Sequence, residues 1–95
     1  MNLKEELMKR LMEIKNAPDS DDVCSIIKNT LEELIDDNIT GLELQLSILF
    51  MLQELHKMTL EAKDYIEINN LKRGIGYVEQ IGHTLGVHSF NYKLN

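Results

Sequence analysis

Tryptophan is absent from this 95-residue sequence and only 5% of the residues are aromatic, so Leu, Ile and Met supply most of the apolar volume. This composition favours the packing of helices over the packing of sheets. One proline and five glycines interrupt the chain rarely, which predicts long, continuous elements. A chain of this length has no room for a second core, so residues 1–95 are expected to form a single domain.

The single cysteine, Cys24, excludes an internal disulfide, so the sequence does not call for an oxidising compartment. The N-terminal segment is charged from Lys4 onward and lacks the apolar run of a secretory signal peptide. The longest apolar stretch, residues 46–52, is far too short to cross a bilayer. We therefore expect a cytoplasmic protein.

The net charge of −6 is unevenly distributed along the chain. Residues 19–43 carry eight acidic side chains against Lys28 alone, whereas residues 68–95 carry a net charge of +2. Nucleic-acid binding requires clustered lysine and arginine for counterion release, and the sequence has no such stripe. A DNA-mimicking inhibitor would need its acids along one helix face, so these acids are interpreted as solvated helix ends. No nucleic-acid partner is expected.

Four amphipathic patterns have helical spacing, and they predict helices at about residues 2–16, 20–36, 41–67 and 71–85. The first helix is expected to end before Pro18, since a proline restricts the residue that precedes it. Asp19 or Ser20 is expected to cap the second helix. Thr40 and Glu43 have the spacing of a capping box and are expected to open the third.

The third pattern is unusually long. Its apolar positions keep helical phase from Leu44 to Ile66, which predicts one continuous helix, with a break at Met58–Thr59 as the alternative. Asn69–Asn70 is then the signal for a turn or a cap. The third helix is therefore expected to reach residue 67 and the fourth to begin at residue 71.

Short connections between amphipathic helices predict an all-α protein, an antiparallel up-down four-helix bundle with a long third helix. Gly86 is expected to close the fourth helix in the left-handed conformation, and residues 87–95 form a short C-terminal tail. The broad apolar coverage of the third helix fits a monomer or a weak dimer equally well.

The sequence contains no residue set with the spacing of a catalytic, metal or phosphate site. The three histidines are scattered, and the Glu-x-x-His pairs of di-iron bundles are absent. Cys24 lies in an acidic stretch on the apolar side of the second helix, where core packing explains it better than reactivity. Gly74 and Gly76 lack the third glycine and the preceding strand of a dinucleotide-binding fingerprint. We expect no enzymatic activity, cofactor or metal.

The end of the sequence is more specific. Residues 77–92 resemble the C-terminal signature of the enterocin A-type bacteriocin immunity proteins, in which an apolar helix is followed by an Ile-Gly-basic-Thr-small-Gly-apolar motif and a tail with an aromatic residue. Leu85 stands where a smaller residue is expected, and Phe90 or Tyr92 supplies the aromatic. The positions that match in order are Ile81, Gly82, His83, Thr84, Gly86 and Val87.

This resemblance implies a cytosolic four-helix bundle that protects a bacterium from its own pediocin-like (class IIa) bacteriocin. Members of the family act from the cytoplasmic side on the mannose phosphotransferase permease when bacteriocin has engaged it, and they do not neutralise the toxin in solution. Their specificity tracks the C-terminal half of the chain. The implied partner is therefore the toxin-bound permease, contacted at the inner face of the membrane.

The residues predicted to recognise the partner lie on the fourth helix and the tail. Phe90 and Tyr92 are amphipathic anchors of the kind enriched at interfaces, and packing of both onto the bundle is an equally good explanation. Glycines of the fourth helix permit close approach to the third helix or to a partner. The alternative function is a small helical adaptor, chaperone or inhibitor of a soluble protein. The predicted recognition residues are Lys72, Arg73, His83, His88, Phe90, Tyr92 and Lys93.

Overall fold

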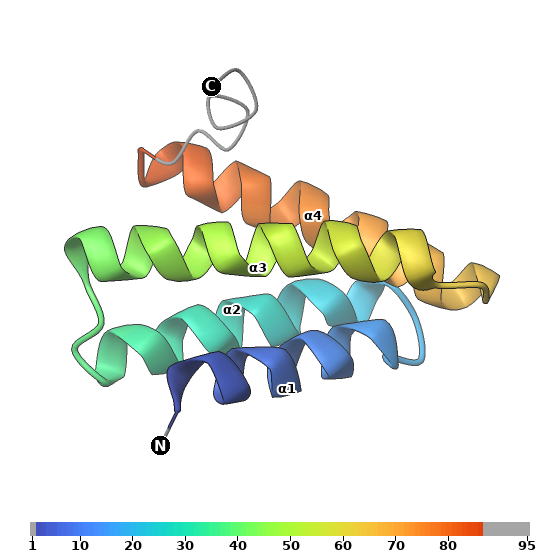
Figure 1. Ribbon diagram of the computed structural model, residues 1–95, viewed down its shortest axis with the longest axis horizontal. Helices are drawn as coiled ribbons and strands as arrows, with labels where there is room; N and C mark the ends of the chain where they lie inside the picture. The colour runs from blue at the N-terminus through green and yellow to red at the C-terminus, as the bar shows by residue number, and fades with distance from the viewer. Residues whose placement is uncertain (1, 87–95) are drawn as a thin grey trace.

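Four α-helices account for most of residues 2–86, the part of the chain that the computed structural model describes. Successive helices run in opposite directions and form an antiparallel up-down bundle (Figure 1). The predicted all-α fold is confirmed, and the third helix is the longest, with 21 residues. The predicted tail at 87–95 lies outside the described residues. The helices are α1 (Leu3–Lys15), α2 (Asp21–Asp36), α3 (Gly41–Glu61) and α4 (Tyr65–Thr84).

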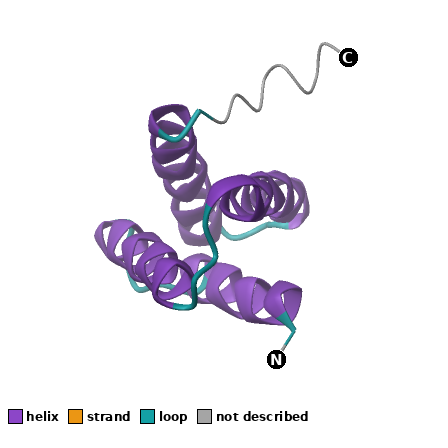
Figure 2. Ribbon diagram, turned by 90° about the vertical axis from the view of Figure 1, so that its left-hand side faces the viewer, coloured by secondary structure: helices purple, strands orange, loops and turns teal. Residues whose placement is uncertain are grey.

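The bundle consists of two helical hairpins, α1–α2 and α3–α4, that pack against each other (Figures 1 and 2). The most extensive helix pair is α3 with α4, and α4 also packs on both α2 and α1. In contrast, α2 and α3 are consecutive in the chain but approach each other less than any of these pairs. Their short link therefore carries the chain from one hairpin to the other.

Aliphatic side chains from all four helices fill the centre of the bundle. Each such side chain, when fully buried, contributes about 1.5–3 kcal/mol to stability through the hydrophobic effect. The packing of these faces, more than helix propensity, therefore holds the four helices together. The core residues with no exposed surface are Leu11, Ile14, Val23, Ile27, Ile48, Met51, Leu55 and Leu71.

The turn between α1 and α2 contains the predicted capping interaction. The Asp19 carboxylate accepts a hydrogen bond from the backbone N–H of Asp21, with 2.8 Å between Oδ1 and N. Ser20 occupies the N-cap position of α2 but makes no side-chain capping bond within residues 2–86. Asp19 rather than Ser20 thus satisfies the start of α2, and the boundaries of both helices agree with the prediction to within one residue.

Two residues with positive φ turn the chain between α2 and α3: Asn38 in the link, at 65°, and Gly41 at the start of α3, at 61°. Asn38 donates its N–H to the carbonyl of Ile35, and Ile39 donates to that of Leu34, which is the hydrogen-bond pattern of a Schellman cap. The predicted capping box is wrong, because Thr40 makes no side-chain capping bond among the described residues. The chain instead turns at Gly41, whose φ favours glycine.

The structure corrects the boundary between the third and fourth helices. α3 continues through Met58–Thr59 but ends at Glu61, and α4 begins at Tyr65, so the predicted limits of 67 and 71 are wrong. Ala62 and Asp64 have extended backbones, and the Asp64 carbonyl accepts the first bond of α4 from the N–H of Ile68. The apolar spacing continues across this break, so periodicity alone could not locate it.

Asn70, which the sequence places in a turn, lies inside α4 and is 1% exposed. Its side-chain amide donates hydrogen bonds to the carbonyl oxygens of Ala17 at 2.9 Å and Lys15 at 3.3 Å. A buried amide group is costly unless it is paired, and these two carbonyls supply the pairing. Asn70 thereby ties the α3–α4 hairpin to the turn of the α1–α2 hairpin.

Candidate functional site

Exposed polar side chains follow one face of α4. Lys72 and Arg73 are both exposed, and they are joined at helical spacing by exposed Gly76 and half-buried Tyr77. Together with neighbouring side chains they line a shallow hollow of about 430 Å³ on the outside of the bundle. We call this hollow the α4 depression, and its lining residues are Cys24, Lys72, Arg73, Gly76, Tyr77 and Gln80.

Gly76 helps to keep the α4 depression open. Apart from its two chain neighbours and the nearby backbone of α4 itself, no described atom lies within 4 Å of the position that a Cβ would occupy there, so the packing of the bundle does not require a glycine. A glycine inside a helix costs about 1 kcal/mol relative to alanine. The residue therefore lowers stability while leaving the backbone of α4 accessible beside two cations.

Gly74, two residues earlier, has a structural role. A Cβ at this buried position would lie 3.4 Å from Ile14 Cγ2 and 3.5 Å from Val23 Cγ1. At Gly74, the close approach that a glycine permits is therefore made toward α1 and α2. The two glycines thus separate into one that serves packing and one that faces outward.

Cys24 contributes to the α4 depression from α2. It is half-buried, so the predicted core position is only partly correct. Residue spacing on α2 alone could not place its thiol beside Lys72 and Arg73, because that neighbourhood depends on how α2 packs against α4. The depression therefore combines two cations with the small, polarisable side chain of Cys24.

His83 lies further along α4, in its last turn, and is exposed. It lies eleven positions after Lys72, which corresponds to roughly 16 Å along the helix axis. Lys72 and Arg73 therefore lie together on α4, whereas His83 lies at a separate position near the end of the same helix. The predicted recognition residues His88, Phe90, Tyr92 and Lys93 lie outside the described residues.

The end of α4 is held by its own cap and by α3. Gly86 has a φ of +83° and donates its N–H to the carbonyl of His83, so the predicted left-handed cap is confirmed. The side-chain amide of Gln45 donates to the carbonyl of Leu85 at 3.0 Å. This bond satisfies a carbonyl that the helix end would otherwise leave to water.

Three residues of the motif at positions 81–87, which carries the resemblance to the immunity proteins, also have structural roles. Gly82 is buried, Ile81 is half-buried against the core, and the Thr84 hydroxyl donates to the backbone carbonyl one turn earlier at 3.2 Å. Beside them lies an apolar hollow of about 280 Å³, formed jointly by α2, α3 and α4. The sequence alone does not reveal this hollow, because its side chains come from three helices. Its lining residues are Leu31, Ile35, Leu44, Ile81, Thr84 and Leu85.

The residues between 2 and 86 contain no group of three His, Cys, Asp or Glu side chains placed to hold a metal ion. In the same part of the chain, no helix has both the length and the apolar character needed to cross a bilayer. No protein family, curated protein or solved structure matches the chain. The α4 surface and the residues of the resemblance motif are therefore the basis for a functional assignment.

Proposed function

We propose that this protein is a bacteriocin immunity protein of a Gram-positive bacterium and acts in the cytoplasm. It binds the mannose phosphotransferase permease from the cytoplasmic side once a pediocin-like bacteriocin has engaged it, and so protects the cell. It acts by contact, without catalysis or a cofactor. The observation that carries the proposal is the outward face of α4, where Lys72 and Arg73 border an open depression on the helix that bears the resemblance motif.

The charge distribution supports contact through α4. The chain as a whole carries a net charge of −6, and eight of its 16 acids lie between residues 19 and 43. The inner leaflet of a membrane is negatively charged and attracts nearby Lys and Arg at about 1 kcal/mol each. A bundle that approaches this leaflet is therefore favoured when Lys72 and Arg73 face it and the acidic residues face the cytoplasm.

The shape of the α4 depression supports the same orientation. Gly76 leaves the backbone open between Lys72 and Tyr77, so a side chain of the permease can reach the helix surface. Tyr77 offers an aromatic ring with a hydroxyl group, a combination that is enriched at protein interfaces. The cations at the rim supply attraction and orientation, and the ring supplies apolar contact.

The test is expression of the protein in a strain that is sensitive to pediocin-like bacteriocins, followed by challenge with a panel of such peptides. We expect the inhibitory concentration to rise at least about tenfold for one or a few of them. Unchanged sensitivity to every peptide would refute the proposal. A partner that copurifies equally well without bacteriocin, and is soluble, would instead favour the adaptor function.

Charge-removing variants locate the contact. Lys72→Gln combined with Arg73→Gln should abolish protection, whereas Lys57→Gln combined with Lys63→Gln removes the same charge elsewhere on the surface and should preserve it. Equal effects of the two double variants would argue against contact through α4. Removal of residues 87–95 tests whether the tail takes part in recognition of the partner. A truncated protein that folds but does not protect would place part of the recognition in the tail.

A further inference from the structure

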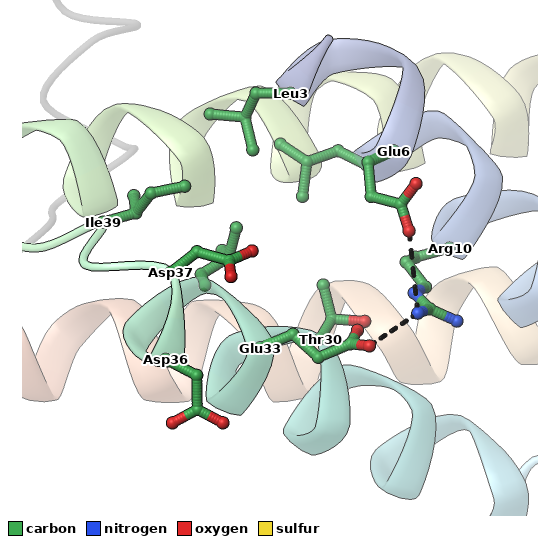
Figure 3. A pocket seen from close by; sticks show the side chains of 10 residues that line it. Leu3, Glu6, Arg10, Thr30, Glu33, Asp36, Asp37 and Ile39 are labelled. Atoms are coloured by element: carbon green, nitrogen blue, oxygen red, sulfur yellow. Dashed lines mark hydrogen bonds and ion pairs between the residues drawn. The ribbon is translucent and has the colours of Figure 1, made fainter. Parts of the chain in front are cut away.

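A groove of about 470 Å³ lies between the first half of α1 and the last turns of α2 (Figure 3). Its floor is apolar, because Leu7 and Leu34 are buried at 2% and 4% exposure. Half-buried Leu3 and Ile39 form its apolar sides and are packed against the same core. We call this feature the α1–α2 groove. It presents apolar surface at the bottom of an otherwise charged region.

Carboxylates surround this apolar floor. Arg10 is the one base among the described residues that line the groove, and it is held by acids on two helices. Its guanidinium lies 2.7 Å from the Glu33 carboxylate, 3.1 Å from that of Glu13 and 3.6 Å from that of Glu6. Partial burial lowers the pKa of Arg10, but these carboxylates outweigh that effect and raise the pKa above its ordinary value. Arg10 is therefore permanently charged, and it is already paired with these three acids.

Two further acids at the rim lack such a partner. Asp36 and Asp37 are exposed at the C-terminal end of α2, and within residues 2–86 neither carboxylate forms an ion pair. The last turn of α2, which is described in full, contains no basic residue. Carboxylates at a helix C-terminus face the negative end of the helix dipole, which is unfavourable. The fold thus places two acids where they oppose its own stability.

Figure 3 shows the Asp37 carboxylate directed toward the space between α1 and α2, while the Asp36 carboxylate is directed away at the outer edge. We propose that the α1–α2 groove binds a basic amphipathic segment of a partner protein. One apolar side chain of that segment enters between Leu3 and Ile39, and a nearby lysine or arginine lies beside Asp37 and Asp36. The ligand's cation would relieve the unfavourable position of these acids and replace the pairing that the chain itself does not provide.

The charge of the groove selects this partner over others. Anionic lipid surfaces and nucleic acids are repelled by a rim of carboxylates. The combination of an apolar floor with an acidic rim is complementary to a helix that has leucine-like side chains and cations on one face. The volume also lies within the range of about 300–1,000 Å³ that is typical of binding pockets, so it can receive several side chains.

The test uses three synthetic peptides and the full-length protein. The first is a fluorescein-labelled amphipathic helix of leucine and lysine, about four turns long. The second replaces every lysine with glutamate, and the third replaces every leucine with serine. Binding is measured by fluorescence anisotropy, and the contact surface is mapped by backbone amide NMR. We expect the leucine–lysine peptide to shift the resonances of Leu3, Thr30 and Ile39, and to bind at least about tenfold more tightly than either matched peptide.

Two matched double variants distinguish the groove from general attraction to an acidic protein. Asp36→Asn with Asp37→Asn should weaken binding by about fivefold or more, since it removes the unpaired acids at the rim. Asp21→Asn with Asp22→Asn removes the same charge at the opposite end of α2 and should leave binding unchanged. Failure of the leucine–lysine peptide to bind, resonance shifts outside the groove, or equal weakening by both double variants would overturn the inference. The result does not depend on the proposed function, because Lys72→Gln with Arg73→Gln leaves this groove intact.

Discussion

The side-chain amide of Asn70 and the carbonyl oxygen of Ala17 lie 2.9 Å apart in a hydrogen bond that spans 53 positions of the sequence. The bond joins the first half of α4 to the turn between α1 and α2. Because Asn70 is almost completely buried, water cannot replace either partner. The relative position of the two hairpins therefore depends in part on this one side chain.

Replacement of Asn70 by alanine should lower the free energy of unfolding by about 1–3 kcal/mol, because it removes the donor from the buried carbonyl of Ala17 and the partly buried carbonyl of Lys15. Urea denaturation followed by circular dichroism measures the change. The neighbouring Asn69 provides the control, since it is exposed and Asn69→Ala should change stability by less than about 0.5 kcal/mol. Similar losses for the two variants would contradict the assigned role of Asn70.

Arg10→Met keeps much of the apolar stem of Arg10 but removes its charge. The variant leaves Glu6, Glu13 and Glu33 without their shared cation, and we expect stability to fall by about 1 kcal/mol at low salt. The deficit should shrink in concentrated salt, because screening weakens the repulsion among the remaining carboxylates. Lys9→Met is the matched control on the exposed face of α1. A deficit that is independent of salt would show that Arg10 acts through packing instead.

Gly76→Ala should raise the free energy of unfolding by about 0.5–1 kcal/mol, because the new methyl group meets open space and alanine favours the helix. Gly74→Leu should have the opposite effect and cost about 1–3 kcal/mol, since the side chain must displace Ile14 and Val23. Thermal unfolding of the two variants shows whether each substitution raises or lowers stability. Stabilisation by Gly74→Leu would contradict the close packing of α4 on α1 and α2.

Gly76→Gln extends this comparison to function. Glutamine favours the helix and projects into the α4 depression, so the variant should be at least as stable as the parent protein. Under the proposed function it should nevertheless protect a sensitive strain less well, because it obstructs the surface beside Lys72 and Arg73. Full protection by a stable Gly76→Gln variant would place the contact elsewhere.

Asp36→Asn and Asp37→Asn should each increase stability by about 0.3–1 kcal/mol, because each removes a negative charge from the C-terminal end of α2. Asp21→Asn and Asp22→Asn should have the opposite sign, since these acids lie in the first turn of the same helix, where negative charge is favourable. Chemical denaturation of the four variants gives the comparison. Destabilisation by the first pair would show that their carboxylates serve the fold.

The sequence predicts the helices well where a local signal marks their ends. Pro18 and Asn38 limit α1 and α2, and both boundaries agree with the structure to within one residue. The sequence around Asp64 carries no comparable signal, because apolar residues continue at helical spacing from Met58 through Ala62 to Tyr65. The antiparallel return of α4 along α3 follows from the short connections between helices, as predicted, but apolar periodicity alone does not mark where the turn begins.

For the candidate site, the sequence predicts the positions of single residues but not the surfaces that several helices form together. Sequence spacing correctly places Lys72 and Arg73 on the fourth helix, where both are exposed. It does not bring Cys24 next to them, and it does not reveal the α1–α2 groove, since Leu3 and Ile39 belong to segments far apart in the chain. Surfaces formed by two or more helices require the packing to be known.

Because α2 and α3 approach each other so little, we expect the folding of this chain to divide into two local events and one long-range event. Each hairpin closes a short loop between neighbouring helices, which costs little chain entropy and favours rapid formation. The expected slow step is then the meeting of the two hairpins, completed when Asn70 bonds to the α1–α2 turn. We therefore expect a backbone nick in the link around Asn38 to yield two fragments that recombine into the native bundle.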